Sequence, residues 1–224
     1  FGINSNLFAQ RFSSVDGTSQ WVEATQIANY GTVFNTAYDG LQIGDVVFMG
    51  YKASPGSRFD SFLQRIDPDG TLPWGINGSD SDANQTDYEM DTKITYQEGS
   101  QYIWATCTYT NTNQSEKGER IQKYDKDTGA RMFSDQAKEI YPIGSEKVHA
   151  GSIHMDENHP LILIKEGFDN GASPTTLHAL KLDEEGDFAW DEETMPLATY
   201  PANKSRIQFT RFVEDHFVAV FIEN

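Results

Sequence analysis

The sequence predicts an all-β protein with the architecture of a four-bladed β-propeller, in which one blade is shared between the two ends of the chain. Two observations lead to this prediction. A turn motif returns at a nearly constant interval, and the runs between its copies are rich in Val, Ile, Thr, Tyr and Phe without a convincing helical period. Each repeat therefore reads as about four short strands, which is the content of a propeller blade.

The recurring motif joins an acidic turn containing glycine to a following aromatic residue. Its clearest copy is LQRIDPDGTLPW at residues 63–74. Further copies are IQKYDKDTGARMF at 121–133, HALKLDEEGDFAW at 178–190 and, in a weaker form, AQRFSSVDGTSQW at 9–21. Asp67, Asp125 and Asp183 lie 58 residues apart, and a period of this length indicates a repeat architecture.

The ends of the chain decide how the repeats are arranged. Whole repeats occupy residues 22–74, 75–133 and 134–190. Residues 191–224 hold only a first half and residues 1–21 only a second half, so their pairing would complete a fourth blade and cover its edge strands. We therefore expect one propeller domain over residues 1–224. A fragment of a larger propeller, or an open β array, stays the alternative, because cutting a repeat array at a whole multiple of its period also gives complementary ends.

The motif itself has a structural explanation. Glycine supplies the positive φ that a tight turn needs, and the acidic residues favour the same turn. The aromatic residue is expected to pack between neighbouring blades. The four residues at this position are Trp21, Trp74, Phe133 and Trp190. Function is then expected where the copies differ.

Composition narrows the range of partners. The 34 acidic and 17 basic residues give a net charge of −17, which argues against nucleic acid, because phosphate binding needs a basic face. No apolar run approaches the ~20 residues that span a bilayer, so membrane insertion is not expected. The single cysteine, Cys107, lies in an apolar run and is expected to be a buried strand residue. The chain starts at Phe1 without a leader, which predicts a processed or excised piece.

A Gln–basic pair precedes the turn in AQRF, LQRID and IQKYD. Together with the turn and the aromatic residue, these segments resemble the Q-x-x-D-x-x-G-x-x-x-W repeats of secreted bacterial β-propeller proteins, and they are similar to quinoprotein-like propeller repeats. The resemblance covers essentially the whole chain, once per repeat. It implies a propeller fold, an extracellular or cell-surface location, and a binding or scaffold role. The period is longer than in quinone-binding repeats, and no residues match a quinone site.

One loop has the composition of a calcium site. Asp80, Asp82, Asn84 and Thr86 alternate with other residues, so one tight loop would turn several oxygen ligands toward a single Ca²⁺. The match to a known calcium loop is partial, because Gln85 stands where the sharp turn favours glycine. The alternative is a polar connector between blades.

The first strand of each blade lines the central channel of a propeller. Alignment of the four repeats on these strands superposes four polar residues, Asn35, Asp91, His149 and Gln208. Four such side chains around one axis would bind an ion, a water molecule or a small polar ligand. The alternative is a water-filled channel whose polar groups satisfy one another.

The sequence contains none of the motifs G-x-S-x-G, H-E-x-x-H and G-x-G-x-x-G, and it contains no P-loop. The first hypothesis is therefore a secreted or cell-surface propeller that binds a protein or glycan partner, or acts as a scaffold, without catalysis. The second is a hydrolase of carbohydrate or phosphate esters that uses carboxylates or Ca²⁺ at the channel mouth. Acids with raised pKa values in a channel-mouth cleft would favour the enzyme. A third reading is a subunit of a larger complex.

Overall fold

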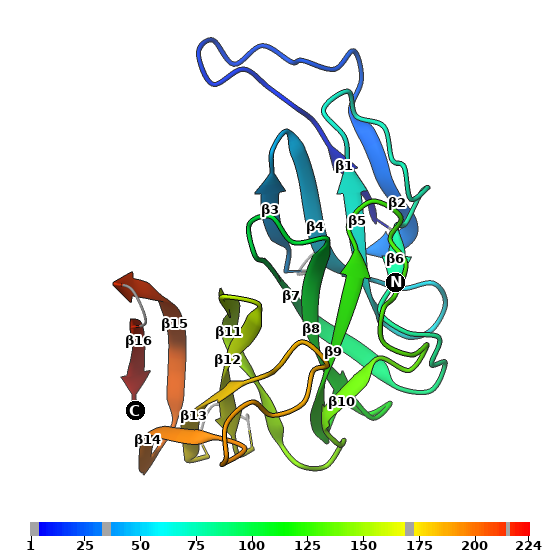
Figure 1. Cartoon of the computed structure of the whole chain (residues 1–224). Coiled ribbons are helices and arrows are strands. Elements are labelled where there is room, and N and C mark those ends of the chain that lie inside the picture. The colour runs from blue at the N-terminus through cyan, green and yellow to red at the C-terminus, as the bar shows by residue number, and fades with distance from the viewer. Residues whose placement is uncertain (1–4, 33–36, 169–172, 214–215) are drawn as a thin grey trace.

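The structure is a computed structural model of the chain, and it describes residues 5–32, 37–168, 173–213 and 216–224. In these residues sixteen strands form five antiparallel sheets, which confirms the all-β prediction. No described segment forms a helix of the length and apolar character that crossing a membrane requires. The sheets follow one another in chain order around an open arc (Figure 1).

Three sheets are complete four-stranded blades. The first blade contains β3 (Asp39–Ile43), β4 (Val46–Ala53), β5 (Asp60–Ile66) and β6 (Ser79–Asp80). The second contains β7 (Tyr88–Tyr96), β8 (Tyr102–Thr110), β9 (Lys117–Asp125) and β10 (Lys138–Tyr141). The third contains β11 (Lys147–Asp156), β12 (His159–Glu166), β13 (Thr175–Lys181) and β14 (Met195–Ala202). Within each blade the strands pair in chain order, as in a meander.

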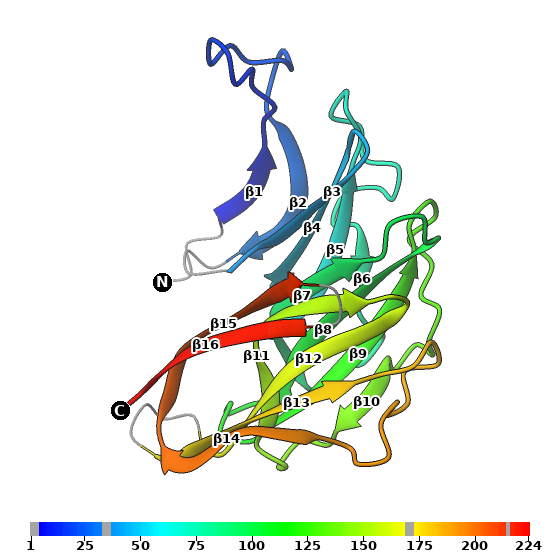
Figure 2. The same ribbon diagram turned by 60° about the vertical axis from the view of Figure 1, so that its left-hand side comes forward.

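The two ends of the chain form separate two-stranded sheets. At the N-terminal end β1 (Ser5–Ala9) pairs with β2 (Thr25–Thr32), and at the C-terminal end β15 (Lys204–Val213) pairs with β16 (His216–Glu223). These sheets lie at opposite ends of the arc and are not paired with each other (Figures 1 and 2). The closed four-bladed ring with a shared blade is therefore not formed. Each sheet is held instead by the blade next to it, β1–β2 by the first blade and β15–β16 by the third.

The blade boundaries also differ from the predicted repeats. The last strand of each blade follows the aromatic residue of the motif, so β6, β10 and β14 belong to the blade before them rather than to the next repeat. In the first blade the first strand is β3, and residues 33–36 before it lie outside the described part of the chain. Edge strands tolerate proline, because its missing N–H faces solvent, and Pro196 accordingly lies within β14.

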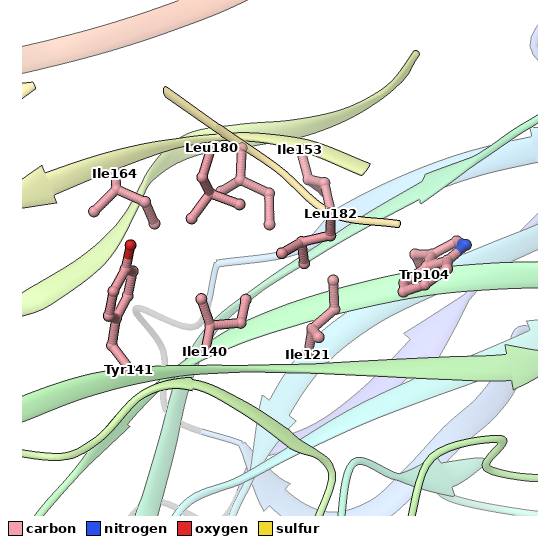
Figure 3. Close-up of a cluster of buried hydrophobic side chains, with 9 residues drawn as sticks. Trp104, Ile121, Ile140, Tyr141, Ile153, Ile164, Leu180 and Leu182 are labelled. Carbon is pink, nitrogen blue, oxygen red and sulfur yellow. The ribbon is translucent and has the colours of Figure 1, made fainter. Parts of the chain in front are cut away.

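The hydrophobic core is divided among the contacts between neighbouring sheets. Figure 3 shows the contact between the second and third blades, where Trp104, Ile121 and Ile140 face Ile153, Leu180 and Leu182. A second cluster around Phe48 and Leu63 joins the first and second blades. Every blade is therefore stabilised by its neighbours rather than by a core of its own, as expected for a repeat protein.

The turn motif builds the outer part of these contacts. Trp74 lies over Gly129 of the next blade, where an added Cβ would be 2.7 Å from the indole, and its Nε1 donates to the carbonyl of Asp127 at 3.1 Å. Trp21 has the same relation to Gly70 and to the carbonyl of Pro68, with an Nε1–O distance of 2.9 Å. Both glycines have positive φ, 74° and 87°. Each of these two positions requires glycine for two reasons: the backbone is left-handed, and the indole above leaves no room for a Cβ.

Candidate functional site

The inner strands β7, β11 and β15 share an irregularity. The pairing register of each shifts near its middle, between Met90 and Lys93, between His149 and Ile153, and between Ser205 and Gln208. The residues with positive φ in these intervals are Asp91 at 57°, Gly151 at 97° and Arg206 at 53°. Bulges re-aim side chains, and a non-glycine residue in this region costs on the order of 1–3 kcal/mol, so such positions are candidates for function.

A cavity of about 180 Å³ lies among these three bulges, and we call it the axial pocket. The strands that line it come from the second blade, the third blade and the C-terminal hairpin. Its charged side chains are Lys117, His149, Lys165, Lys204, Arg206 and Asp91. Basic groups thus outnumber acidic ones around this pocket, although the whole chain has twice as many acidic as basic residues.

His149 is fixed in the wall of the pocket by a buried contact with a carboxylate. Its Nδ1 lies 2.8 Å from Oε1 of Glu119, and its backbone N–H donates to Oε2 of the same carboxylate at 3.0 Å. The hydroxyl groups of Thr106 and Thr108 also donate to this carboxylate. Burial alone would lower the pKa of His149, but the charge and hydrogen bond of Glu119, together with the charge of Asp91, raise it above its ordinary value.

Lys204 is the most enclosed cation at the pocket. Its side chain is completely buried, and Nζ donates to the carbonyls of Thr175 at 2.9 Å, Tyr200 at 2.5 Å and Ala202 at 3.2 Å. Glu223 lies 3.3 Å from the same ammonium group. These partners hold Lys204 in place and Glu223 compensates its charge, whereas Arg206 is exposed at the opening.

The structure brings together two of the four predicted channel residues. Asp91 and His149 both line the axial pocket. Gln208 is exposed on β15 opposite Val220 and is not part of the lining, and Asn35 lies outside the described residues. The bulges explain the difference, because the extra residue shifts the alignment and puts Arg206 at the pocket. The sequence alone gives no signal for a bulge in β15.

The candidate calcium residues accept hydrogen bonds from the protein. Asp82 is buried and accepts from Tyr109 Oη at 2.8 Å and from the N–H of Asn84 at 2.7 Å. Asn84 Oδ1 in turn accepts from the N–H and the hydroxyl of Thr86, both at 2.8 Å, while Asp80 lies in β6. In the described part of the chain, no three or more His, Cys, Asp or Glu side chains are arranged to hold a metal ion. Calcium binding stays a prediction.

A cluster of acidic residues lies between the first and second blades; the sequence predicted one of them, Asp80, as a calcium ligand but did not connect it with Asp60 and Glu89. Burial raises the pKa of Asp60, Asp80 and Glu89, and the pKa of Asp80 reaches about 7 because the charge of Asp60 adds to the effect of burial. One carboxylate oxygen on each has no hydrogen-bond partner. None of the three lines the axial pocket. The only signal in the sequence was the presence of acids inside strand-like runs.

Comparison with known proteins gives distant structural similarity. No protein-family model matches the sequence, and no curated protein sequence matches it. An arabinanase from Bacillus subtilis is similar at 13% identity and a TM-score of 0.44, over 78% of this chain and 62% of the arabinanase. A GH43 endo-arabinanase from Bacillus licheniformis is similar at 10% identity and a TM-score of 0.46, over 84% of this chain and 72% of the enzyme.

This chain therefore spans less than two thirds of the first neighbour. Both neighbours are named as arabinanases.

Proposed function

We infer that the chain is a binding module whose axial pocket takes a small anionic group, such as a phosphate or the carboxylate of an acidic sugar. The observation that carries this proposal is the concentration of basic side chains around one cavity of an acidic chain. A volume of about 180 Å³ suits a group of this size and is smaller than a typical drug-sized pocket. The extracellular or cell-surface location and a glycan partner remain part of the same proposal.

The electrostatics of the pocket support an anion rather than a cation. Lys204 and His149 are already bound to Glu223 and Glu119, so the group that faces an incoming anion is Arg206, which is exposed at the opening. Lys117 and Lys165 add basic residues to the lining, and Asp91 is the one acidic residue in it. An anion at the opening would gain charge-assisted hydrogen bonds from the planar guanidinium of Arg206.

Calorimetric titration with inorganic phosphate and with glucuronate tests the proposal. We expect saturable binding that weakens as the ionic strength rises. Arg206→Gln is expected to weaken binding roughly tenfold, because it removes one charge-assisted contact. Lys126→Gln removes the same charge from a turn that does not line the pocket and serves as the matched control. The proposal is wrong if neither anion binds, or if both variants weaken binding equally.

Hydrolysis of carbohydrate is the second candidate. The observation that favours it is the exposed carboxylate of Asp91 beside His149 in the pocket. Most glycoside hydrolases need two carboxyl groups flanking the bond, and Glu119 is fully buried under His149. Incubation with arabinan, followed by chromatography of released sugars, separates the two functions. Release that disappears in Asp91→Asn would favour the enzyme over the binding module.

A further inference from the structure

The two ends of the arc carry separate halves of a contact that the interior of the arc makes three times. In the interior, Trp21, Trp74 and Phe133 lie over Gly70, Gly129 and Gly186. Trp190, the fourth aromatic residue, instead lines a cavity of about 420 Å³. Gly17, the fourth turn glycine, has φ of 75° and open space within 4 Å of the position of a Cβ. In the described residues, Trp190 therefore has no turn glycine beneath it, and the Gly17 turn has no aromatic residue above it.

The turn at Gly17 has the same hydrogen-bond pattern as the turn at Gly129, which does carry an aromatic residue. Its N–H donates to the carbonyl of Ser13 at 2.9 Å, as the N–H of Gly129 donates to the carbonyl of Asp125 at 2.8 Å. The N–H of Ser13 also donates across the turn, to the carbonyl of Thr18 at 2.8 Å. The N-terminal turn is therefore already formed, and it differs from the turn at Gly129 in having no aromatic residue over its glycine.

The residue before each turn completes the comparison. Ile66, Tyr124 and Leu182 precede the turns of the three blades and are 4%, 0% and 1% exposed. Phe12 precedes the N-terminal turn and is 67% exposed. In the second blade Tyr124 packs in the same cluster as Trp74. The corresponding place for Phe12 is the cavity beside Trp190, whose walls include Phe209, Phe217 and Phe221.

The free strand edges are complementary in register as well. In the blades the second strand pairs with the third, as in Met49 with Gln64 and Ile162 with Leu180. The same register sets Ala219 of β16 opposite Gln10 and Val220 opposite Ala9. On β16 and the N-terminal pair, the large apolar side chains left exposed are Phe8, Phe12, Val15, Val22, Val218, Val220 and Ile222. Pairing of β1 with β16 would extend the sheet. It would cover the exposed apolar side chains of these two strands, and also Phe12, which follows β1 in the chain.

We propose that the β16 edge binds the N-terminal strand pair of a second copy of this chain, with Phe12 in the Trp190 cavity and the Gly17 turn under the indole. A second copy fits because the two halves within one chain are held apart. The N-terminal pair is packed on the first blade around Ala28, Tyr51 and Phe62, and Trp21 is bonded there to Pro68. The C-terminal hairpin is packed on the third blade. Association joins the halves without breaking either contact.

The mass of the particle in solution tests the proposal. Native mass spectrometry at micromolar concentration is expected to show assemblies of at least twice 25.2 kDa. Phe12→Ser should weaken association roughly tenfold or more, because it removes the apolar anchor of the contact. Val22→Ser removes another exposed apolar side chain, from the connection between β1 and β2 and outside the proposed contact, and should leave the mass unchanged. A wild-type monomer would overturn the proposal.

A disulfide distinguishes a second copy from closure within one chain. Ala9→Cys combined with Val220→Cys places the thiols opposite each other across the proposed edge, and the native Cys107 is buried. Oxidation should give a covalent dimer or larger species on a non-reducing gel. Ala9→Cys combined with Asn113→Cys, in an exposed loop, should not. A disulfide formed only inside single chains would overturn the second-copy assignment, as would the absence of any cross-link.

Discussion

The outer rim of the blades and their inner strands come from the same repeats but differ in chemistry. At the rim the same contact recurs, an aromatic ring over a turn glycine, as Trp74 over Gly129 shows. At the inner strands the equivalent bulge positions hold three different residues, Asp91, Gly151 and Arg206. The rim therefore repeats what the fold requires, while the inner positions vary and surround a cavity. In this chain the fold and the candidate site occupy different parts of each repeat.

The largest effect on stability is expected at the inner side, from Glu119→Ala. This change leaves the buried His149 ring, its backbone N–H and the Thr106 hydroxyl without their shared carboxylate, and losing one partner of a buried pair costs about 3–5 kcal/mol. Urea unfolding at neutral pH measures the loss. Glu119→Gln keeps the shape and one acceptor and should cost less. A loss below about 1 kcal/mol in the alanine variant would mean that the pair is not a structural link between the blades.

The rim is expected to respond less strongly, because its aromatic residues are only half-buried. Trp74→Ala should cost about 3 kcal/mol, the lower part of the range for aromatic truncation, since the indole covers the cluster of Phe48 and Leu63. Trp74→Phe keeps an aromatic ring and loses the hydrogen bond to Asp127, so it should cost about 1 kcal/mol. Equal losses in the two variants would show that the hydrogen bond, rather than packing, holds the rim.

The same comparison explains what the sequence could predict. Turns at Gly70 and Gly129, and the aromatic residues above them, follow from local rules, because glycine and its neighbours determine a tight turn. Strand content follows from composition in the same way. The local signals of β10 and β14 are weaker, because they are edge strands, and β14 contains proline. Whether the two ends of the chain pair with each other depends on the curvature of the whole arc, and no local sequence pattern determines that curvature.

The candidate site was predictable only in part for the same reason. Asp91 and His149 could be placed on inner strands from the repeat alignment, but Arg206 depends on a bulge, and the Glu119–His149 pair joins residues 30 positions apart on different blades. The cluster of Asp60, Asp80 and Glu89 likewise forms only when two blades meet. Such contacts arise from packing between repeats, and the sequence of one repeat does not specify them.

The third effect is a dependence of stability on pH, at the contact between the first and second blades. The pKa of Asp80 is raised from 3.8 to about 7 in the folded chain, chiefly by burial, so its contribution to stability is complete below about pH 4. This contribution is lost as the pH rises from about 4 to about 7, because over this range the carboxyl ionises in the unfolded chain but stays protonated in the folded one. Asp80→Asn should flatten the dependence of the unfolding free energy on pH between 4 and about 8.

Asp69 provides the matched control for Asp80, with a shift of opposite sign. Hydrogen bonds from the backbone and the hydroxyl of Thr71 lower the pKa of Asp69 at an exposed turn. Stability from this group is present above its ordinary pKa and lost in acid, so Asp69→Asn should affect the acidic arm of the same curve. If Asp80→Asn and Asp69→Asn change the curve in the same direction, burial of Asp80 is not the cause.

The smallest effect is expected at Arg206, where stability and binding should move in opposite directions. Glycine adopts φ of 53° without the steric cost of an arginine side chain, so Arg206→Gly should keep the stability unchanged or raise it by up to about 1 kcal/mol. The same change removes the guanidinium from the axial pocket and should weaken phosphate binding. A strained residue is retained in such a position when its side chain is needed there. A variant that binds phosphate as tightly as the wild type would mean that Arg206 contributes strain without contributing to the site.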